Sequence, residues 1–306
     1  MNIISDRRDF IKKAAVLTGV IGAGSSSVLA FSNQLNKIQN PLPKWKGFNL
    51  LDFFSSNPGR SRRGTTEEDF KWMSDWGFDF VRIPMSYPSY LNIDRSRDIT
   101  PDEVYNIDEE AVERVDKLVH MAHKYNLHVS INLHRAPGYC INAGFHEPYN
   151  LWVDKEAQEA FYWHWDMWAS RYKNISSDRI SFDLLNEPAM IEDMNDQHSS
   201  KTIIPGDLYA QVAERAANAI WKHNKDHLVI ADGNQVGNKI IPEITHLPIA
   251  QSCRGYHPHM ISHYKAPWAM KDIENLPPLQ YPGQVGNQYL SREMLEDFYE
   301  PWIKLA

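Results

Sequence analysis

The chain of 306 residues is long enough for one large layered fold or for two domains, with ample material for a hydrophobic core. Hydrophobic residues make up 42% of it and charged residues 23%, and a formal net charge of −7 gives no reason to expect a nucleic-acid partner. Two cysteines exclude a disulfide framework, and the high aromatic content suits either a core or the flat faces of sugars.

The first thirty residues differ from the rest and predict an export signal. A basic stretch with Arg7 and Arg8 precedes the short apolar run AAVLTGVIGAG and a small-x-small site that ends at Ala30. The arginine pair resembles the twin-arginine export signal, and the apolar run is too short to span a bilayer. We therefore expect an exported chain, periplasmic or extracellular, with no membrane anchor after cleavage of residues 1–30 and with a linker over residues 31–45.

From residue 46 onward, short β-like segments alternate with longer helical segments, which is the pattern of βα units around a parallel sheet. In chain order we expect strands over residues 47–54, 78–84, 127–134, 179–185, 227–232 and 248–256. The helices expected between and after them cover residues 65–77, 108–126, 155–173 and 206–224, and a last helix begins at Arg292.

The number of these units predicts the α/β class and a (β/α)8 TIM barrel of which the chain holds about six units. Eight parallel strands close such a barrel. We therefore expect a barrel domain over residues 46–306 that is incomplete at its C-terminal end, and the abrupt final stretch EDFYEPWIKLA favours a fragment. The alternative is an open α/β sheet of six units, although no glycine-rich phosphate loop follows the first strand.

Polar residues stand at the ends of the predicted strands. In parallel barrels the loops that follow the strands meet at one rim, which carries the reactive groups. The residues at these positions are Asn49, Asp52, Arg82, His134, Asn186, Glu187, Asp232, Tyr256, His257 and His259. Each one alone could serve packing or loop stability, but together they place a cation, hydrogen-bonding groups and a carboxyl group where a polar substrate would lie.

Several segments resemble a known enzyme family. GFNL on the first strand, VRIP on the second, NLHRAPGY on the third and LLNEP on the fourth look like glycoside hydrolase family 5, and CRGYHPHMISHYK looks like its sixth-strand region. The resemblance covers residues 44–306. It implies a cellulase-like retaining β-glycanase that acts on a β-linked polysaccharide or oligosaccharide, with an endo-β-1,4-glucanase as the expected type and no cofactor or metal.

The resemblance also implies roles for the strand-end residues. Glu187 would be the general acid that protonates the leaving glycosidic oxygen and then the base that activates water. Asn186 would donate to the sugar 2-hydroxyl. Arg82 and His134 would line the subsite of the cleaved sugar, with Arg82 orienting the second carboxylate.

The sixth-strand region would complete the substrate site. Tyr256 matches the tyrosine of the family, whereas the histidine that the family has two residues earlier falls on Arg254. Trp268 is a candidate platform for a sugar ring. Trp152 is another, although core packing explains it equally well.

One catalytic group is missing from the expected pattern. The nucleophile of the family is a Glu at the end of the seventh strand, which we do not find in this chain. A retaining glycosidase needs two carboxyl groups about 5 to 5.5 Å apart, so we expect no hydrolysis by this chain alone. Asp52, Glu147 or Asp232 could act as the base of an inverting mechanism, but none has the strand-seven location.

Two other functions are compatible with the sequence. A carbohydrate-binding protein that has lost its chemistry would keep the aromatic cleft. A metal hydrolase is suggested by His257, His259 and His263, with His134 nearby. However, metal-dependent barrel hydrolases place their histidine pair on the first strand, which has no histidine here. The preferred glycan and the oligomeric state do not follow from these residues.

Overall fold

The computed structural model describes residues 42–56, 64–141, 148–193, 196, 199–270 and 272–306. The chain divides into two units, Met1–Pro43 and Lys44–Ala306, and the second unit carries the elements below. The predicted export signal and most of the predicted linker lie outside the described residues. No helix within these described ranges has both the length and the apolar character needed to cross a bilayer.

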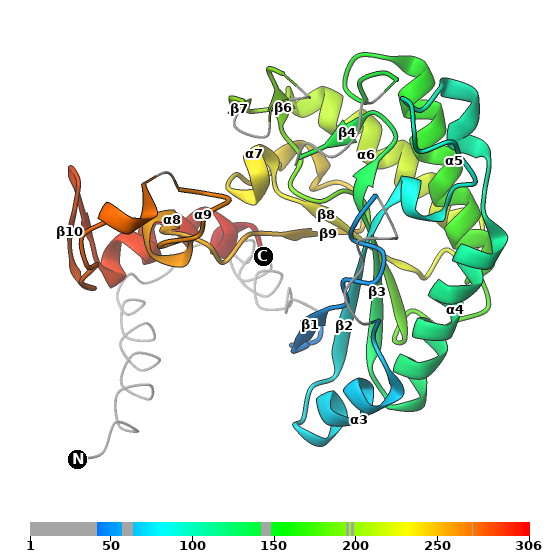
Figure 1. Ribbon diagram of the computed structural model, residues 1–306, viewed down its shortest axis with the longest axis horizontal. Coiled ribbons are helices and arrows are strands. Elements are labelled where there is room, and N and C mark those ends of the chain that lie inside the picture. Colours follow the sequence, from blue (N-terminus) through cyan, green and yellow to red (C-terminus); the bar gives the residue numbers. More distant parts are fainter. Residues whose placement is uncertain (1–41, 57–63, 142–147, 194–195, 197–198, 271) are drawn as a thin grey trace, which may run out of the picture. The chain divides into compact units, whose positions relative to one another are not determined.

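Six parallel strands form the central sheet (Figure 1). They are β1 (Gly47–Asn49), β2 (Phe80–Ser86), β3 (His128–Ala136), β5 (Ile180–Asp183), β8 (Leu228–Asp232) and β9 (Ile249–Ser252), and they pair in that order. Each crossover therefore leads to the next neighbour in the same direction, as in the wall of a barrel, whereas the strand order of a doubly wound sheet reverses at a switch point. The sheet is a wall of six strands of the TIM barrel fold.

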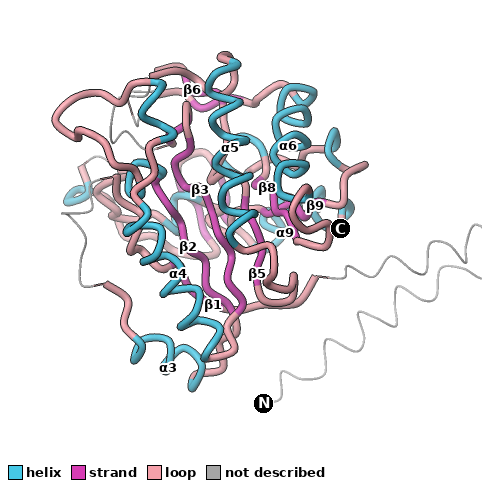
Figure 2. Tube along the Cα trace, turned by 90° about the vertical axis from the view of Figure 1, so that its right-hand side faces the viewer, coloured by secondary structure: helices cyan, strands magenta, loops and turns pink. Residues whose placement is uncertain are grey.

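Helices follow the first four of these strands. They are α3 (Glu67–Asp75), α4 (Glu109–Lys124), α5 (Lys155–Arg171) and α6 (Gly206–Trp221). Figures 1 and 2 show α4, α5 and α6 together on one face of the sheet. Two 3-10 helices, η2 (Tyr87–Tyr90) and η3 (Pro101–Tyr105), connect β2 to α4.

The remaining elements, apart from the last helix, are short. Three strand pairs are antiparallel: β3 with β4 (Tyr139–Cys140), β6 (Met190–Ile191) with β7 (Lys201–Thr202), and β10 (Gly283–Val285) with β11 (Gln288–Leu290). The short helices are α7 (Asn234–Gly237), η4 (Pro242–Ile244), α8 (His259–Ser262) and η5 (Ile273–Asn275). The last element is α9 (Arg292–Leu305).

Local sequence signals explain where the helices begin and end. Thr66 and Asp69 form the capping box of α3, and Gly77 follows its end with a φ of 78°, which favours glycine. The side chain of Asp108 accepts a hydrogen bond from the Ala111 backbone N–H and begins α4. These boundaries agree with the predicted ones.

The first strand is shorter than the predicted segment of residues 47–54. It ends at Asn49; the Leu50 N–H still donates to the Arg82 carbonyl oxygen at 2.8 Å, and residues 52–54 then form a turn. The Asp52 carboxylate accepts hydrogen bonds from the backbone N–H of Thr65 at 2.8 Å and from its hydroxyl group at 2.6 Å. Asp52 thus joins the loop after β1 to the start of the α3 region.

The core fills the space between the sheet and its helices. Trp165 and Trp168 on α5 are fully buried there. Trp152 is also buried, and its ring stacks on that of Tyr209 with centroids 5.9 Å apart. Packing therefore accounts for Trp152.

Candidate active site

A cavity of about 340 Å³ is lined by the central strands and by residues at their C-terminal ends. Residues two apart on a strand face the same side, and Phe80 and Arg82 of β2 both line the cavity. The other lining residues are Asn49, Ser130, His134, Asp183, Asn186, Glu187, Ile230, Ser252, Arg254, Gly255 and Tyr256. Most of them are polar, as the strand-end rule for parallel barrels leads one to expect.

Six of the strand-end residues line this cavity. They are Asn49, for which no role was predicted, and Arg82, His134, Asn186, Glu187 and Tyr256, for which roles were predicted. Trp268 does not line it, and 70% of its side chain is exposed beyond α8. The exposed position of Trp268 does not support its predicted role as a sugar platform. The roles of the other five residues remain predictions.

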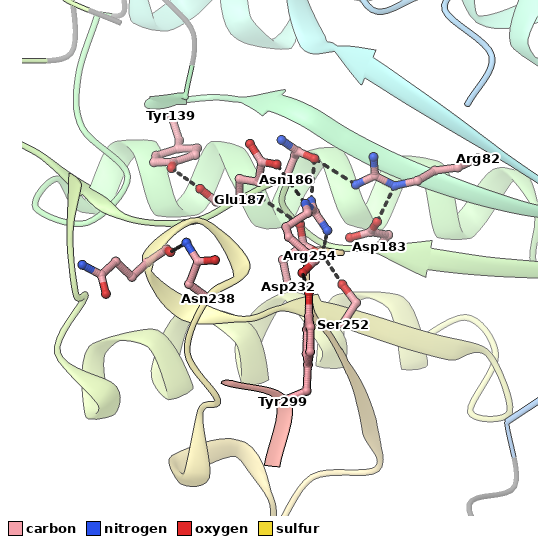
Figure 3. A network of polar contacts seen from close by, with 11 residues as sticks. Arg82, Tyr139, Asp183, Asn186, Glu187, Asp232, Asn238, Ser252, Arg254 and Tyr299 are labelled. Atoms are coloured by element: carbon pink, nitrogen blue, oxygen red, sulfur yellow. Dashed lines mark hydrogen bonds and ion pairs between the residues drawn. The ribbon is translucent and has the colours of Figure 1, made fainter. Parts of the chain in front are cut away.

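Two hydrogen bonds fix the backbone of Glu187, one at its N–H and one at its carbonyl oxygen (Figure 3). Its N–H donates to Asp232 Oδ2 at 2.8 Å, and its carbonyl oxygen accepts from the Tyr139 hydroxyl group at 2.6 Å. Its φ of 51° lies in the left-handed region, which is uncommon for a residue other than glycine. Such conformations persist where the surroundings hold them and often occur at functional sites.

Arg254 joins the polar groups around Glu187. Its Nε donates to Glu187 Oε1 at 2.9 Å, and its guanidinium also pairs with the fully buried Asp232 carboxylate. Burial opposes the charge of Arg254, but the carboxylates of Asp232, Glu187 and Asp183 outweigh this effect and raise its pKa. The Glu187 carboxylate therefore has a cation as its direct partner.

The amide of Asn186 is oriented by two arginines. Its Oδ1 accepts from a guanidinium nitrogen of Arg254 at 2.8 Å and from one of Arg82 at 3.2 Å. Guanidinium groups only donate, so these contacts identify the oxygen end of the amide. The opposite atom, Nδ2, is buried without a hydrogen-bond partner among the described residues, and it can donate to a ligand.

His134 is a neutral imidazole at the cavity. Burial first, and the charges of nearby arginines second, lower its pKa well below the ordinary value. Its Nδ1 is buried and, like the hydroxyl group of Ser130, has no partner within the described part of the chain. Buried polar atoms usually have hydrogen-bond partners, so these atoms suit a ligand that is rich in hydroxyl groups.

Arg82 forms its main contact with an acid that sequence reasoning missed. Its Nε donates to Asp183 Oδ2 at 2.7 Å, and the acid is buried at the base of the cavity. Burial raises the pKa of Asp183, and the Arg82 guanidinium opposes that rise. A signal was present, because an acidic residue inside the apolar stretch FDLL needs a buried partner.

Two of the other acids that the sequence offered as a base, Asp52 and Asp232, do not line the cavity. Asp232 accepts hydrogen bonds from Ser252, Arg254 and the Glu187 backbone. Asp52 binds Thr65 and lines a different hollow. Glu147 lies outside the described residues. Of the described residues that line the cavity, Asp183 and Glu187 carry carboxyl groups.

The histidines after β9 do not gather around a metal position. His257 stacks on Phe298 with centroids 3.8 Å apart, and His259 stacks on His263 at 4.6 Å. No group of three His, Cys, Asp or Glu side chains in the described part of the chain could hold a metal ion. The geometry of these residues therefore does not form the zinc site considered from the sequence.

A family model described as cellulase, glycosyl hydrolase family 5, matches residues 35–299. The chain belongs to glycosyl hydrolase family 5. This family 5 chain is 37% identical over 146 residues to cellodextrinase A of Ruminococcus flavefaciens, an alignment that covers 46% of the chain and 40% of the relative. It is 26% identical over 223 residues to endoglucanase C of Acetivibrio thermocellus, covering 72% and 58%. The chain thus spans about half the length of these curated relatives.

Solved structures agree with family 5 membership. A crystal structure of a glycoside hydrolase is 33% identical, with a TM-score of 0.74 over 86% of this chain and 75% of the other. The endoglucanase Cel5A from the hyperthermophile Thermotoga maritima is 21% identical, with a TM-score of 0.60 over 85% of this chain and 74% of the other. The second likeness shows a shared fold, which is the predicted TIM barrel.

Proposed function

We propose that this family 5 chain forms the acid-base and sugar-binding part of a site that cleaves β-linked glucan, with Glu187 as the proton donor. The observation that carries the proposal is the set of unpartnered polar atoms beside Glu187, above all Asn186 Nδ2. The relatives named cellodextrinase and endoglucanase support a β-linked glucan. The Cel5A structures with cellobiose and with mannotriose support an oligosaccharide ligand.

The proposed chemistry has two steps, as in a retaining glycosidase. In the first, a carboxylate attacks the anomeric carbon, the bond to the glycosidic oxygen breaks, and that oxygen takes the proton of Glu187. In the second, the Glu187 carboxylate takes a proton from water, which attacks the anomeric carbon and releases the attacking carboxylate. Asn186 Nδ2 would donate to the 2-hydroxyl, and Arg254 would hold the Glu187 carboxylate between the two steps.

We propose further that the attacking carboxylate does not come from the described residues. Of the two carboxyl groups that line the cavity there, Glu187 is the proton donor and Asp183 is buried in its pair with Arg82. The expected property of the chain is therefore binding of a β-linked oligosaccharide without hydrolysis.

An assay with phenyl β-cellobioside, with and without sodium azide, tests this assignment. Phenol is a poor leaving group, so its release depends on protonation by Glu187. Azide can take the place of the attacking carboxylate by attacking the anomeric carbon on the face opposite the leaving group. We expect no release without azide, and release with azide together with an α-glycosyl azide product.

Two variants make the assay specific. Glu187→Gln should lower the azide-dependent rate at least about 100-fold, since general acid catalysis contributes about 10² to 10⁴. Glu192→Gln, which changes an exposed acid five residues further along, should keep the rate.

Equal rates for both variants would refute the role of Glu187. Release without azide that is lost in Glu187→Gln would show that the chain holds its own attacking carboxylate. Cellobiose binding without chemistry under any condition would favour the carbohydrate-binding function.

A further inference from the structure

Another hollow lies on the helical face of the barrel wall. It has a volume of about 520 Å³ and lies at α5, α6 and the end of η3. Figure 2 shows α5 and α6 side by side on this face. The lining residues are Tyr105, Glu159, Tyr162, Trp163, Asp166, Arg215, Ala219 and Lys222. None of them lines the cavity of Glu187.

Exposed aromatic rings form part of this hollow. The rings of Tyr105 and Trp163 are perpendicular, with centroids 5.2 Å apart, and the side chains are 40% and 37% exposed. The adjacent ring of Tyr162 is covered by the guanidinium of Arg215, 4.3 Å from its centroid. Tyr105 and Trp163 thus present ring surface to solvent, while the third ring is part of a packed floor. Aromatic faces of this kind are suited to flat, partly apolar ligands such as pyranose rings.

The charges around the rings balance each other. Arg215 donates to Glu159 at 2.8 Å, and Lys222 donates to Asp166 at 2.9 Å. The hollow therefore has no excess of one sign that would favour a nucleic acid or a strongly charged peptide. A sugar hydroxyl group can donate to a carboxylate and accept from a cation, so a neutral ligand with many hydroxyl groups can use both kinds of group.

We propose that this hollow, the Tyr105–Trp163 groove, is a second binding site for a segment of a β-linked glucan chain. The choice of glucan rests on the proposed function, whereas the preference for a neutral, hydroxyl-rich ligand rests on the groove itself. A second contact with the same polymer raises the effective concentration of glucan at the protein. The groove would then hold the polysaccharide while the cavity of Glu187 binds the same polymer at one of its glycosidic bonds.

Retention of the full chain on insoluble cellulose tests the groove. Trp163→Ala and Tyr105→Ala should each weaken retention about tenfold, whereas Trp76→Ala should have no effect. Trp76 is the matched control because it is an exposed tryptophan, at 69%, that lies at the end of α3 and outside the groove. Thermal unfolding of each variant, followed by circular dichroism, shows whether it is folded. Having two groove variants keeps the test valid if one of them unfolds.

The results separate the groove from the central site. Calorimetric titration with cellobiose reports on the central cavity, where Asn186→Ala should abolish binding and Trp163→Ala should leave it unchanged. Retention by both groove variants equal to that of the Trp76 control would overturn the proposal, as would an equal loss in all three. If the groove variants lose retention and the chain does not bind cellobiose, the results would support the groove and count against the proposed function.

Discussion

Arg254 and Asp232 form the support on which the position of Glu187 depends. Asp232 is fully buried, and it binds both the guanidinium of Arg254 and the backbone N–H of Glu187. Its own backbone carbonyl accepts from the Tyr209 hydroxyl group at 2.7 Å. A buried carboxylate is stable only with such partners, because its desolvation costs several kcal/mol. The same contacts therefore serve the stability of the fold and the placement of the proposed acid.

Replacing this arginine should destabilise the protein strongly. Arg254→Met keeps much of the side-chain volume but leaves Asp232 buried without its cation, so we expect a loss of about 3 to 5 kcal/mol. Urea denaturation followed by tryptophan fluorescence measures the change. Arg292→Met is the control, since Arg292 pairs with Glu296 on the exposed surface of α9 and such pairs contribute about 0 to 1 kcal/mol. Similar midpoints for the two variants would contradict this account.

The sequence predicted which residues belong to the site better than it predicted which of them pair with each other. Strand-end positions alone placed Arg82, His134, Asn186 and Glu187 at one cavity, because the rule depends only on strand direction. The role of Arg254 could not be predicted in this way. Its contacts reach residues 22 to 68 positions away along the chain, so they depend on how the ends of β5, β8 and β9 lie against each other.

Among the helices, α5 carries a buried histidine that connects it to the two 3-10 helices. His164 Nε2 donates to the Val104 carbonyl oxygen at 2.9 Å, because a carbonyl can only accept. This leaves Nδ1 to accept from the Tyr90 hydroxyl group at 3.0 Å. A protonated ring could not accept that bond. Burial lowers the pKa of His164 to about 3.

This histidine should make the protein less stable in acid. The unfolded chain takes up a proton near the ordinary pKa of about 6.5, whereas the folded chain does not until about pH 3. Stability is therefore fully present above pH 6.5 and declines as the pH falls, by about 2 kcal/mol at pH 5 from this residue alone. His164→Gln should flatten the decline in urea midpoints between pH 7 and pH 5. His120→Gln, on the exposed side of α4, should keep it, and equal slopes for the two variants would refute the assignment.

Helices were easier to predict than short strands, for a local reason. The signals that begin and end α3 and α4 lie within a few residues of each helix, as with Thr66 and Asp108. The strands of the β10–β11 hairpin have three residues each and show too few alternations to be recognised. After the early end of β1, the turn at residues 52–54 contains Asp52, whose carboxylate binds Thr65 thirteen residues away.

At the scale of the whole barrel wall, the two outer strands pair on one side only within the described residues: β1 pairs with β2, and β9 pairs with β8. Phe48 of β1 is 44% exposed, and its ring contacts that of Phe78 at 4.6 Å. Trp72 and Trp76 of the neighbouring α3 region are also exposed. Unpaired strand edges beside exposed apolar side chains favour association between chains.

The full chain should therefore associate with itself through the β1 edge as its concentration rises. Sedimentation velocity over a hundredfold range of concentration should show an increasing weight-average mass. Phe48→Lys should shift the onset of association to about tenfold higher concentration, because a lysine on an edge strand opposes pairing with another strand. Ile203→Lys adds the same charge at another exposed apolar position, between β7 and α6, and should leave the onset unchanged. A monomer at every concentration, or an equal shift in both variants, would show that the β1 edge does not cause association.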